Sequence, residues 1–262
     1  MMTSLRAFAF LILLTCFAGF QKGAAAEECT AFSGNGVNNW YPFSYRTEEG
    51  HLTGVMVDGM REALKRVGLK LTIQVDRPWK RIIYDLENAH VDMVLGAYWN
   101  SERAEKFHYS EAMGTDELRI FVKSGKEFTF HAFADLIGRS GMHLLGGSLG
   151  DEFDTFSQKH LDLQEVPQSD AIITMLQNDR ADYGILGYVE GLKFIHTQKL
   201  EGEITALPKA ILANAMHVMI SKEATCAHKL EAVNQAIKDM KTDGTLDRIL
   251  NDHLKKIADY AQ

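Results

Sequence analysis

The chain has 262 residues, with 28 lysine and arginine side chains against 35 aspartate and glutamate side chains, so its formal net charge at pH 7 is −7. An acidic chain without a basic cluster does not suit nucleic acids or anionic membrane surfaces, and we expect neither as a partner. The histidines and cysteines show no metal-ligand spacing, so the sequence predicts no metal ion and no other cofactor.

The first residues have the three-part layout of a secretory signal peptide. Arg6 precedes an apolar run over residues 7–20, and a run of three alanines ends at Ala26. A short positive segment, an apolar segment and a small-residue cleavage site are the marks of such a peptide. Residues 1–26 are therefore predicted to be removed, which leaves a mature chain that begins at Glu27 and resides in the periplasm without inserting into the membrane.

Two alternatives for this segment stay open. One is a membrane anchor, although the run is shorter than the about 20 apolar residues that span a bilayer. The other is a lipoprotein with Cys16 as the lipidated residue, although Thr15 is a poor residue before such a cysteine.

Cys29 and Cys226 are the two cysteines left after cleavage. An even pair in an oxidising compartment favours one disulfide, which would close a very long loop. Two buried free thiols are the alternative, and the sequence does not separate the two.

The first half of the mature chain alternates helical and extended patterns. The predicted elements are a helix over Met56–Val67 that ends at Gly68, a strand over Leu69–Val75, a helix over Pro78–Asn88 and a strand over Val91–Leu95. Such α/β alternation is typical of a mainly parallel sheet.

The middle of the chain repeats this alternation after an extended segment, Leu118–Val122. Ser169 stands where the N-cap of a helix is expected. The predicted elements are a short helix over His131–Ile137, a strand over Gly141–Leu145, a helix over Asp151–Lys159, a strand over Leu163–Val166, a helix over Ala171–Asn178 and a strand over Ala181–Leu186.

The C-terminal part has a strand, Met216–Ile220, and two helices, Thr225–Met240 and Thr245–Ile257, but no α/β unit of its own. We expect it to return to the first lobe, so that the chain crosses between two lobes near residues 122 and 213. Two crossings are the usual basis of hinged closure around a ligand. The predicted boundaries are 27–121 for the first lobe, 122–212 for the second and 213–262 for the return.

Motifs along nearly the whole mature chain resemble those of the family 3 extracellular solute-binding proteins, which supply polar amino-acid transporters. In chain order they are Trp40-Tyr41-Pro42-Phe43-Ser44-Tyr45, Gly50-His51-Leu52-Thr53-Gly54 with Asp58, Trp79 with Arg81, Asn88-Ala89-His90-Val91-Asp92, residues 101–110, Gly146-Gly147-Ser148, Gln168-Ser169-Asp170 and residues 175–182. Each motif is weak alone, but their order and spacing together are specific.

The resemblance implies an α/β, periplasmic-binding-protein-like fold, with two α/β lobes joined by a two-segment hinge. It also implies a monomer that captures a small, carboxylate-bearing solute, delivers it to the membrane permease of an ABC transporter and catalyses nothing.

Residues of the predicted first lobe supply six expected ligand contacts. Trp40 and Tyr41 follow the first strand and offer flat rings with polar tips, whereas core packing is an equal reading for Phe43. The rigid fork of Arg103 suits a carboxylate, and the resemblance gives the matching arginine that role. The other three are Gly96, Ala97 and Tyr98, which immediately follow a buried strand.

The predicted second lobe supplies Gly147, Ser148, Ser169 and Tyr188. Amides and hydroxyls of the first three would complete a carboxylate site. In amino-acid binders of the family an aspartate after the second-lobe strand receives the ammonium group, but Leu186, Gly187 or Tyr188 stands there in this chain. Glu190 is near, and we expect it to point elsewhere on its helix. The resemblance therefore leaves open whether the solute carries an amine.

Two other activities are possible on this scaffold. One is a sensory module that presents its ligand to a membrane receptor. The other is a dehydratase of cyclic acids, for which an acid or base with a shifted pKa would be needed in the cleft. Glu111, Asp116 and Glu190 are the candidates in the sequence for that role.

Overall fold

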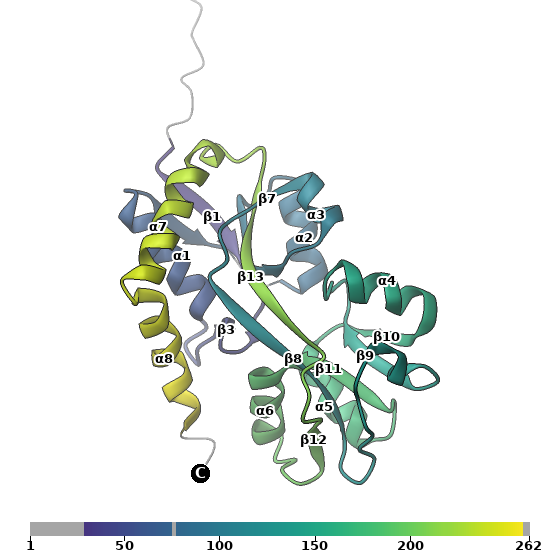
Figure 1. Cartoon of the computed structure of the whole chain (residues 1–262). Helices are drawn as coiled ribbons and strands as arrows, with labels where there is room; N and C mark the ends of the chain where they lie inside the picture. Colours follow the sequence, from purple (N-terminus) through teal and green to yellow (C-terminus); the bar gives the residue numbers. More distant parts are fainter. Residues whose placement is uncertain (1–28, 75–76, 259–262) are drawn as a thin grey trace, which may run out of the picture.

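The computed structural model describes residues 29–74 and 77–258, so the predicted signal peptide lies outside the described residues. Two groups of helices and strands are connected by a pair of long antiparallel strands, β8 (Gly114–Lys123) and β13 (Leu212–Ser221) (Figure 1). No helix within the described ranges is long and apolar enough to cross a bilayer.

The group nearer the N-terminus is called the first lobe. It contains β1 (Ala31–Asn35), β2 (Asn39–Trp40), β3 (Ser44–Arg46), β4 (Leu52–Thr53), α1 (Val55–Arg66), β5 (Lys70–Ile73), α2 (Trp79–Glu87), β6 (Met93–Tyr98), α3 (Ser101–Lys106), β7 (Phe107–Tyr109), the 3-10 turn η2 (Ala227–Lys229), α7 (Leu230–Thr242) and α8 (Thr245–Ala258).

The other group is called the second lobe. It contains the 3-10 turn η1 (Phe133–Leu136), β9 (Ser140–Leu144), α4 (Asp151–His160), β10 (Asp162–Val166), α5 (Ser169–Gln177), β11 (Tyr183–Gly187), α6 (Tyr188–Thr197) and β12 (Ile204–Ala206).

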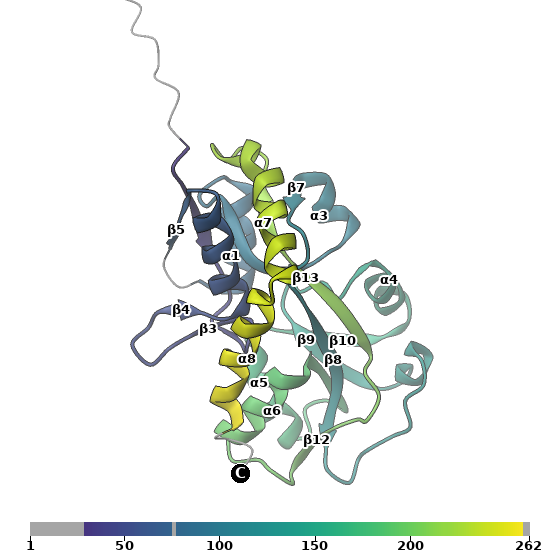
Figure 2. The same ribbon diagram turned by 60° about the vertical axis from the view of Figure 1, so that its left-hand side comes forward.

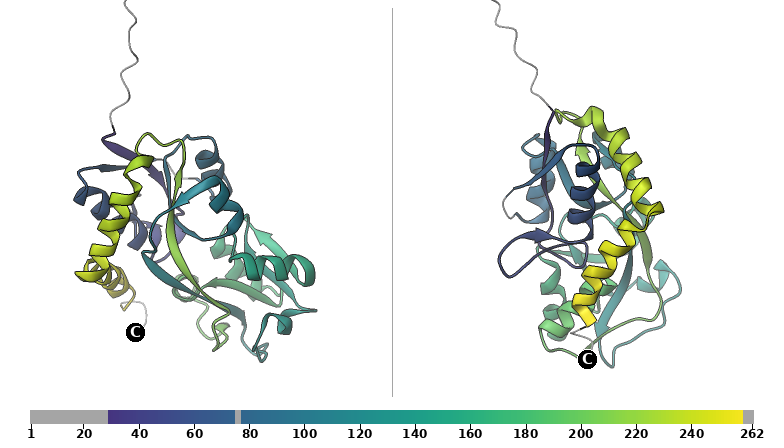
Figure 3. Two further views of the ribbon diagram at one scale, coloured as in Figure 1. Left: turned by 45° about the horizontal axis from the view of Figure 1, so that its top comes forward. Right: turned by 90° about the vertical axis from the view of Figure 1, so that its left-hand side faces the viewer.

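One ten-stranded sheet runs through both lobes in the order β10-β9-β11-β8-β13-β6-β1-β5, with β12 beside β8 and β7 beside β13. Strand β1 pairs in parallel with β5 and β6, and β9 pairs in parallel with β10 and β11. Each lobe therefore has the parallel core that α/β alternation predicts, whereas β8 and β13 supply the antiparallel centre (Figure 3).

The buried apolar side chains form separate cores in the two lobes. The largest cluster packs Phe32 and Met56 of the first lobe against Val218 and Ile237 from the end of the chain. Two clusters in the second lobe draw their residues from β8 and the segment that follows it, up to Ile211. Helix α7 packs on α1, and α8 continues toward the second-lobe end of the molecule (Figures 1 and 2). The predicted boundary at residue 121 falls inside β8, and residues of this strand on both sides of that position contribute side chains to a second-lobe core. The exact lobe boundaries therefore stay a prediction.

The predicted helices and strands are present in the expected order, with three differences at helix starts. The helix predicted over His131–Ile137 is the shorter 3-10 turn η1, which begins at Phe133. Gln168 holds the N-cap position of α5, without a side-chain cap, and Ser169 is the first helical residue. The helix predicted from Thr225 begins at Leu230, because the tighter turn η2 follows the disulfide-bonded Cys226. Strands β2, β3, β4, β7 and β12 have two or three residues each, too few to show a period in the sequence.

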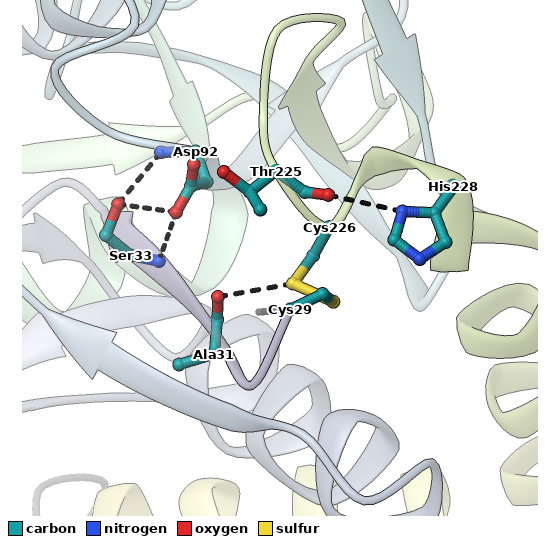
Figure 4. The surroundings of a disulfide bond; sticks show 7 residues. All are labelled: Cys29, Ala31, Ser33, Asp92, Thr225, Cys226 and His228. Atoms are coloured by element: carbon teal, nitrogen blue, oxygen red, sulfur yellow. Dashed lines mark hydrogen bonds between the residues drawn. A yellow bond between two sulfur atoms is a disulfide. The ribbon is translucent and has the colours of Figure 1, made fainter. Parts of the chain in front are cut away.

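Cys29 and Cys226 form a disulfide, so the alternative of two free thiols is wrong. The bond joins the residue two positions before β1 to the turn between β13 and α7 (Figure 4). Nearby, the Asp92 carboxylate accepts hydrogen bonds from the Ser33 amide at 2.7 Å and from its hydroxyl at 2.8 Å. The two ends of the first lobe are thus covalently connected across 197 positions of sequence.

Candidate ligand-binding site

A cavity of about 410 Å³ lies between the two lobes. From the first lobe it is lined by residues after β1, at the start of α2, at the end of β6 and in α3; from the second lobe, by residues after β9, at the start of α5 and at the junction of β11 and α6. These are the carboxyl ends of parallel strands, where open α/β sheets bind their ligands.

Eight of the ten predicted contact residues line this cavity, and their contact with a ligand stays a prediction. They are Trp40, Gly96, Ala97, Tyr98, Arg103, Gly147, Ser148 and Ser169. Two bulky aromatic residues, Tyr98 and Trp99, follow each other at this point of the chain. Trp99 is 48% exposed and is not among the lining residues, so Tyr98 narrows the cavity and Trp99 does not.

Tyr41 and Tyr188 are not among the lining residues. Tyr41 lies in the turn that follows β2, directly after Trp40, which lines the cavity. Tyr41 is 3% exposed, and its hydroxyl donates to the backbone carbonyl of His253 in α8. The Tyr188 ring lies under the guanidinium of Arg119, 4.1 Å from its central carbon.

Arg103 reaches across the cleft. Asn100 caps the start of α3 by accepting the Arg103 amide at 2.8 Å, and the Arg103 Nη2 donates to the carbonyl of Gly146 in the second lobe at 2.9 Å. Trp79 Nε1 donates to the same carbonyl at 3.0 Å, and the guanidinium lies 5.5 Å from the Trp79 ring centre. Burial lowers the pKa of Arg103 from its ordinary value. The fork has five donors, so it can hold a carboxylate while it keeps the Gly146 contact.

The Gly147 amide and the Ser148 hydroxyl, which are predicted to hold a ligand carboxylate, already donate hydrogen bonds within the protein. The Gly147 amide donates to the Leu144 carbonyl at 2.9 Å, and the Ser148 hydroxyl donates to Asp154. These donors hold the loop after β9 in shape. Among the predicted contact residues, Arg103 therefore remains the candidate for holding an anion.

Asp116 lies behind the aromatic wall of the cavity. Its Oδ2 accepts hydrogen bonds from Trp40 Nε1 at 2.8 Å and from the Tyr98 hydroxyl at 2.6 Å. The Trp40 ring meets the Tyr98 ring edge-on, with 5.3 Å between centroids, while Phe43 belongs to the first-lobe core. Burial raises the pKa of Asp116 to about 6, against the hydrogen bonds from Tyr98 and Trp40, which lower it.

Glu190 points into the cavity, so the expectation that it points elsewhere on its helix is wrong. Helix α6 begins directly at Tyr188, which makes Glu190 its third residue. A glutamate at that position folds back toward the N-cap, and here the Gly187 amide and the Ser169 hydroxyl lie beside its carboxylate and favour its charged form. Burial, and then the charge of Asp116, raise its pKa well above the usual range.

The third acid considered for catalysis, Glu111, lies away from the cavity. Its carboxylate is 3.4 Å from Lys238 Nζ and 3.8 Å from Lys241 Nζ, in partly exposed ion pairs. Across residues 29–74 and 77–258 there is no group of three or more histidine, cysteine, aspartate or glutamate side chains that could hold a metal ion.

Gly96 allows Trp40 to form the aromatic wall. Its φ is 113°, and a Cβ there would lie 2.7 Å from Trp40 Cζ3. We expect Gly96→Ala to lower the free energy of unfolding by about 1–3 kcal/mol, through backbone strain and displacement of the ring. Urea unfolding followed by tryptophan fluorescence measures this. Gly125→Ala is the control for φ strain alone, because its φ is 85° and no atom lies within 4 Å of its Cβ position. Equal losses in the two variants would contradict the contact with Trp40.

Asp116 gives the fold a specific pH dependence. Its pKa is 3.8 in an exposed carboxyl group and about 6 in the folded chain, so the folded state binds the proton more tightly. The contribution of protonated Asp116 to the free energy of unfolding is therefore full below about pH 4 and is lost as the pH rises through about 6. Asp116→Asn should raise the free energy of unfolding by on the order of 2 kcal/mol at pH 7 and leave it unchanged near pH 4. Urea unfolding of both proteins across this range measures the difference; a pH-independent difference would contradict it.

Comparisons with known proteins agree with the two-lobed fold. The sequence profile of the bacterial extracellular solute-binding proteins, family 3, matches residues 36–256. The L-cystine-binding protein TcyJ of Escherichia coli (strain K12) is 25% identical over 219 residues, which cover 82% of this chain and 79% of that protein.

Two solved structures show the same two-lobed fold. A histidine kinase sensor domain with similarity to periplasmic binding proteins superposes with a TM-score of 0.73 at 18% identity, over 86% of this chain and 96% of that one. An ancestral arginine-binding protein bound to arginine superposes with a TM-score of 0.72 at 20% identity, over 85% and 97%. With a family profile that spans most of its length, the chain belongs to the bacterial extracellular solute-binding proteins of family 3.

Proposed function

We propose that the protein is exported through its N-terminal signal peptide and captures a solute with both a carboxylate and an ammonium group, an amino acid or a close relative, for an ABC transporter. The observation that carries this proposal is a single cavity lined by Arg103 from the first lobe and by Glu190 from the second. A cationic and an acidic side chain on opposite lobes match the two ends of an amino acid, and both ends engage only when the lobes close.

The rest of the cavity supports a ligand with an apolar or polarisable body. Trp40, Trp79 and Tyr98 provide aromatic walls, while Leu118 and Ile185 provide aliphatic surface. A volume of about 410 Å³ lies in the range of small-molecule sites. TcyJ is named for binding L-cystine, which has two carboxylates, two ammonium groups and a disulfide body, so L-cystine is the first solute to test.

A thermal-shift screen tests the proposal. The panel contains L-cystine, L-arginine, L-glutamine and L-phenylalanine, each with its deaminated acid and its decarboxylated amine. A ligand present at 100 times its dissociation constant adds about 2.7 kcal/mol to the free energy of unfolding, which gives a clear rise in melting temperature. At least one amino acid should stabilise the protein more than both of its truncated partners. A deaminated acid that stabilises it as well as the parent would contradict the ammonium site.

The structural likeness to a histidine kinase sensor domain supports a second candidate, a soluble sensor of the same solute. Reconstitution separates the two roles. A transport protein in its ligand-bound form should stimulate ATP hydrolysis by its permease in proteoliposomes, and a sensor should not.

A further inference from the structure

We propose that Glu190 carries a proton while the cavity is empty and releases it when the ammonium group of a solute binds, so that capture is coupled to proton release. The inference rests on the proposed function, because it assigns the ammonium group to Glu190. It concerns the end of the cavity near Glu190 and Asp116, called the acidic end, which is built from β8, β11, α5 and α6.

The first step is the position of Asp116 beside the start of α6. A Cβ placed on Gly187 would lie 2.9 Å from Asp116 Oδ2 and 3.1 Å from Oδ1. The Asp116 carboxylate thus fills the space that a side chain at position 187 would occupy. Gly187 is also the N-cap of α6, and its amide lies beside the Glu190 carboxylate. The two carboxyl groups therefore meet at the same residue, from β8 and from α6.

The second step is that both groups are buried without a cation. Glu190 is 5% exposed and Asp116 is 2% exposed. Neither forms an ion pair with any residue that the structure describes. Lys193, one turn along α6, instead lies over the rings of Tyr41 and Tyr45, with its Nζ 4.6 Å and 5.3 Å from their centres. Two buried carboxylates that share a site do not both stay ionised, because each charge is desolvated and repels the other.

The third step is which group holds the proton. Asp116 accepts hydrogen bonds from Trp40 and Tyr98, which favour its charged form. Burial and the charges of Asp116 and Asp170 raise the pKa of Glu190, against the neighbouring Ser169 hydroxyl and Gly187 amide, which lower it. The other charged neighbours are Glu117 next to Asp116 and Lys193 next to Glu190. The proton therefore resides on Glu190, on the cavity side of the pair.

An ammonium group beside Glu190 reverses this balance. A cation at hydrogen-bond distance favours the ionised carboxylate, so the proton leaves to solvent as the cation binds. The ammonium group of the solute then balances the negative charge of Glu190, while the Arg103 guanidinium balances the charge of the solute carboxylate. Affinity for an amino acid should then rise with pH wherever empty Glu190 is protonated and occupied Glu190 is ionised, by up to about tenfold per pH unit.

Calorimetric titration with the amino acids of the panel tests the coupling. At pH 7, in buffers that differ in ionisation enthalpy, the dependence of the observed heat on the buffer gives the number of protons released. Wild-type protein should release about one proton per bound amino acid and none with a deaminated acid. Glu190→Gln should release none and bind more than tenfold more weakly. Glu231→Gln, in the first turn of α7 but exposed, is the matched control and should behave as wild type.

Binding of an amino acid to the wild type without proton release, or equal release by Glu190→Gln, would overturn the inference and leave the proposed function standing. If no panel solute binds, the proposed function fails, and a ligand-free measurement still decides the protonation of Glu190. Infrared difference spectra at pH 7 should show a protonated carboxyl band in wild type and in Glu231→Gln that Glu190→Gln lacks. A spectrum of wild type without that band would overturn the inference.

Discussion

Arg103→Ala is expected to weaken binding of an amino acid by about 4 kcal/mol, close to a thousandfold in the dissociation constant. Arg103 is the group proposed to hold the solute carboxylate, since the Gly147 amide and the Ser148 hydroxyl already donate within the second lobe. Its removal also breaks the interlobe hydrogen bond to the Gly146 carbonyl and uncovers the Trp79 ring. Calorimetric titration with the tightest-binding panel solute measures the loss.

Two control variants separate recognition from general damage. Arg103→Lys keeps the charge but loses the planar fork, so its affinity should fall between those of wild type and Arg103→Ala. Arg119→Ala removes a guanidinium that stacks on Tyr188 outside the cavity and should bind as wild type does. The carboxylate site is wrong if Arg103→Ala retains wild-type affinity.

Replacement of both Cys29 and Cys226 by serine is expected to lower the free energy of unfolding by about 5 kcal/mol. The disulfide closes a loop across 197 positions, and in the chain-entropy account the stabilisation grows with the length of the loop. It also holds β1 next to the turn after β13, where the C-terminal return joins the first lobe.

Urea unfolding monitored by circular dichroism measures this loss. Wild-type protein unfolded in the presence of a reductant should show a similar fall, which separates the broken bond from the effect of the serine side chains. A loss below about 1 kcal/mol in both experiments would show that the bond adds little to the stability of the folded chain.

Much of the fold is predictable because it depends on local pattern. The spacing of Trp79, Ile82 and Leu86 places one face of α2 in the core, and all three are buried. The alternation of helix and strand predicts a parallel core in each lobe, which β1 and β9 confirm with their parallel neighbours. The long strands β8 and β13 extend beyond the predicted segments. The first half of β8 contains Gly-Thr-Asp-Glu, and Asn214 interrupts the first half of β13, so neither half shows a continuous apolar run.

The site depends on features that a linear pattern does not contain. Arg103, which lines the cavity, is predicted as a ligand contact because its motif matches that of the family. Glu190 is missed because its direction depends on the first residue of α6: a start at Tyr188 makes it a third-position glutamate that folds back toward Gly187. Glutamate three residues after an N-cap was the available signal. The sequence identifies Asp116 as a candidate acid, but the hydrogen bonds that it accepts from Trp40 and Tyr98 join residues distant in sequence and follow only from the strand order.

A crystal structure of the protein with L-cystine, or with the tightest-binding amino acid of the panel, tests the placement of Arg103 and Glu190 directly. The ligand should lie in the cavity between the lobes, with its carboxylate on the Arg103 guanidinium and its ammonium group within hydrogen-bond distance of Glu190, at about 2.7–2.9 Å. A ligand bound elsewhere, or one whose ammonium group contacts neither Glu190 nor Asp116, would contradict the proposed mode of capture.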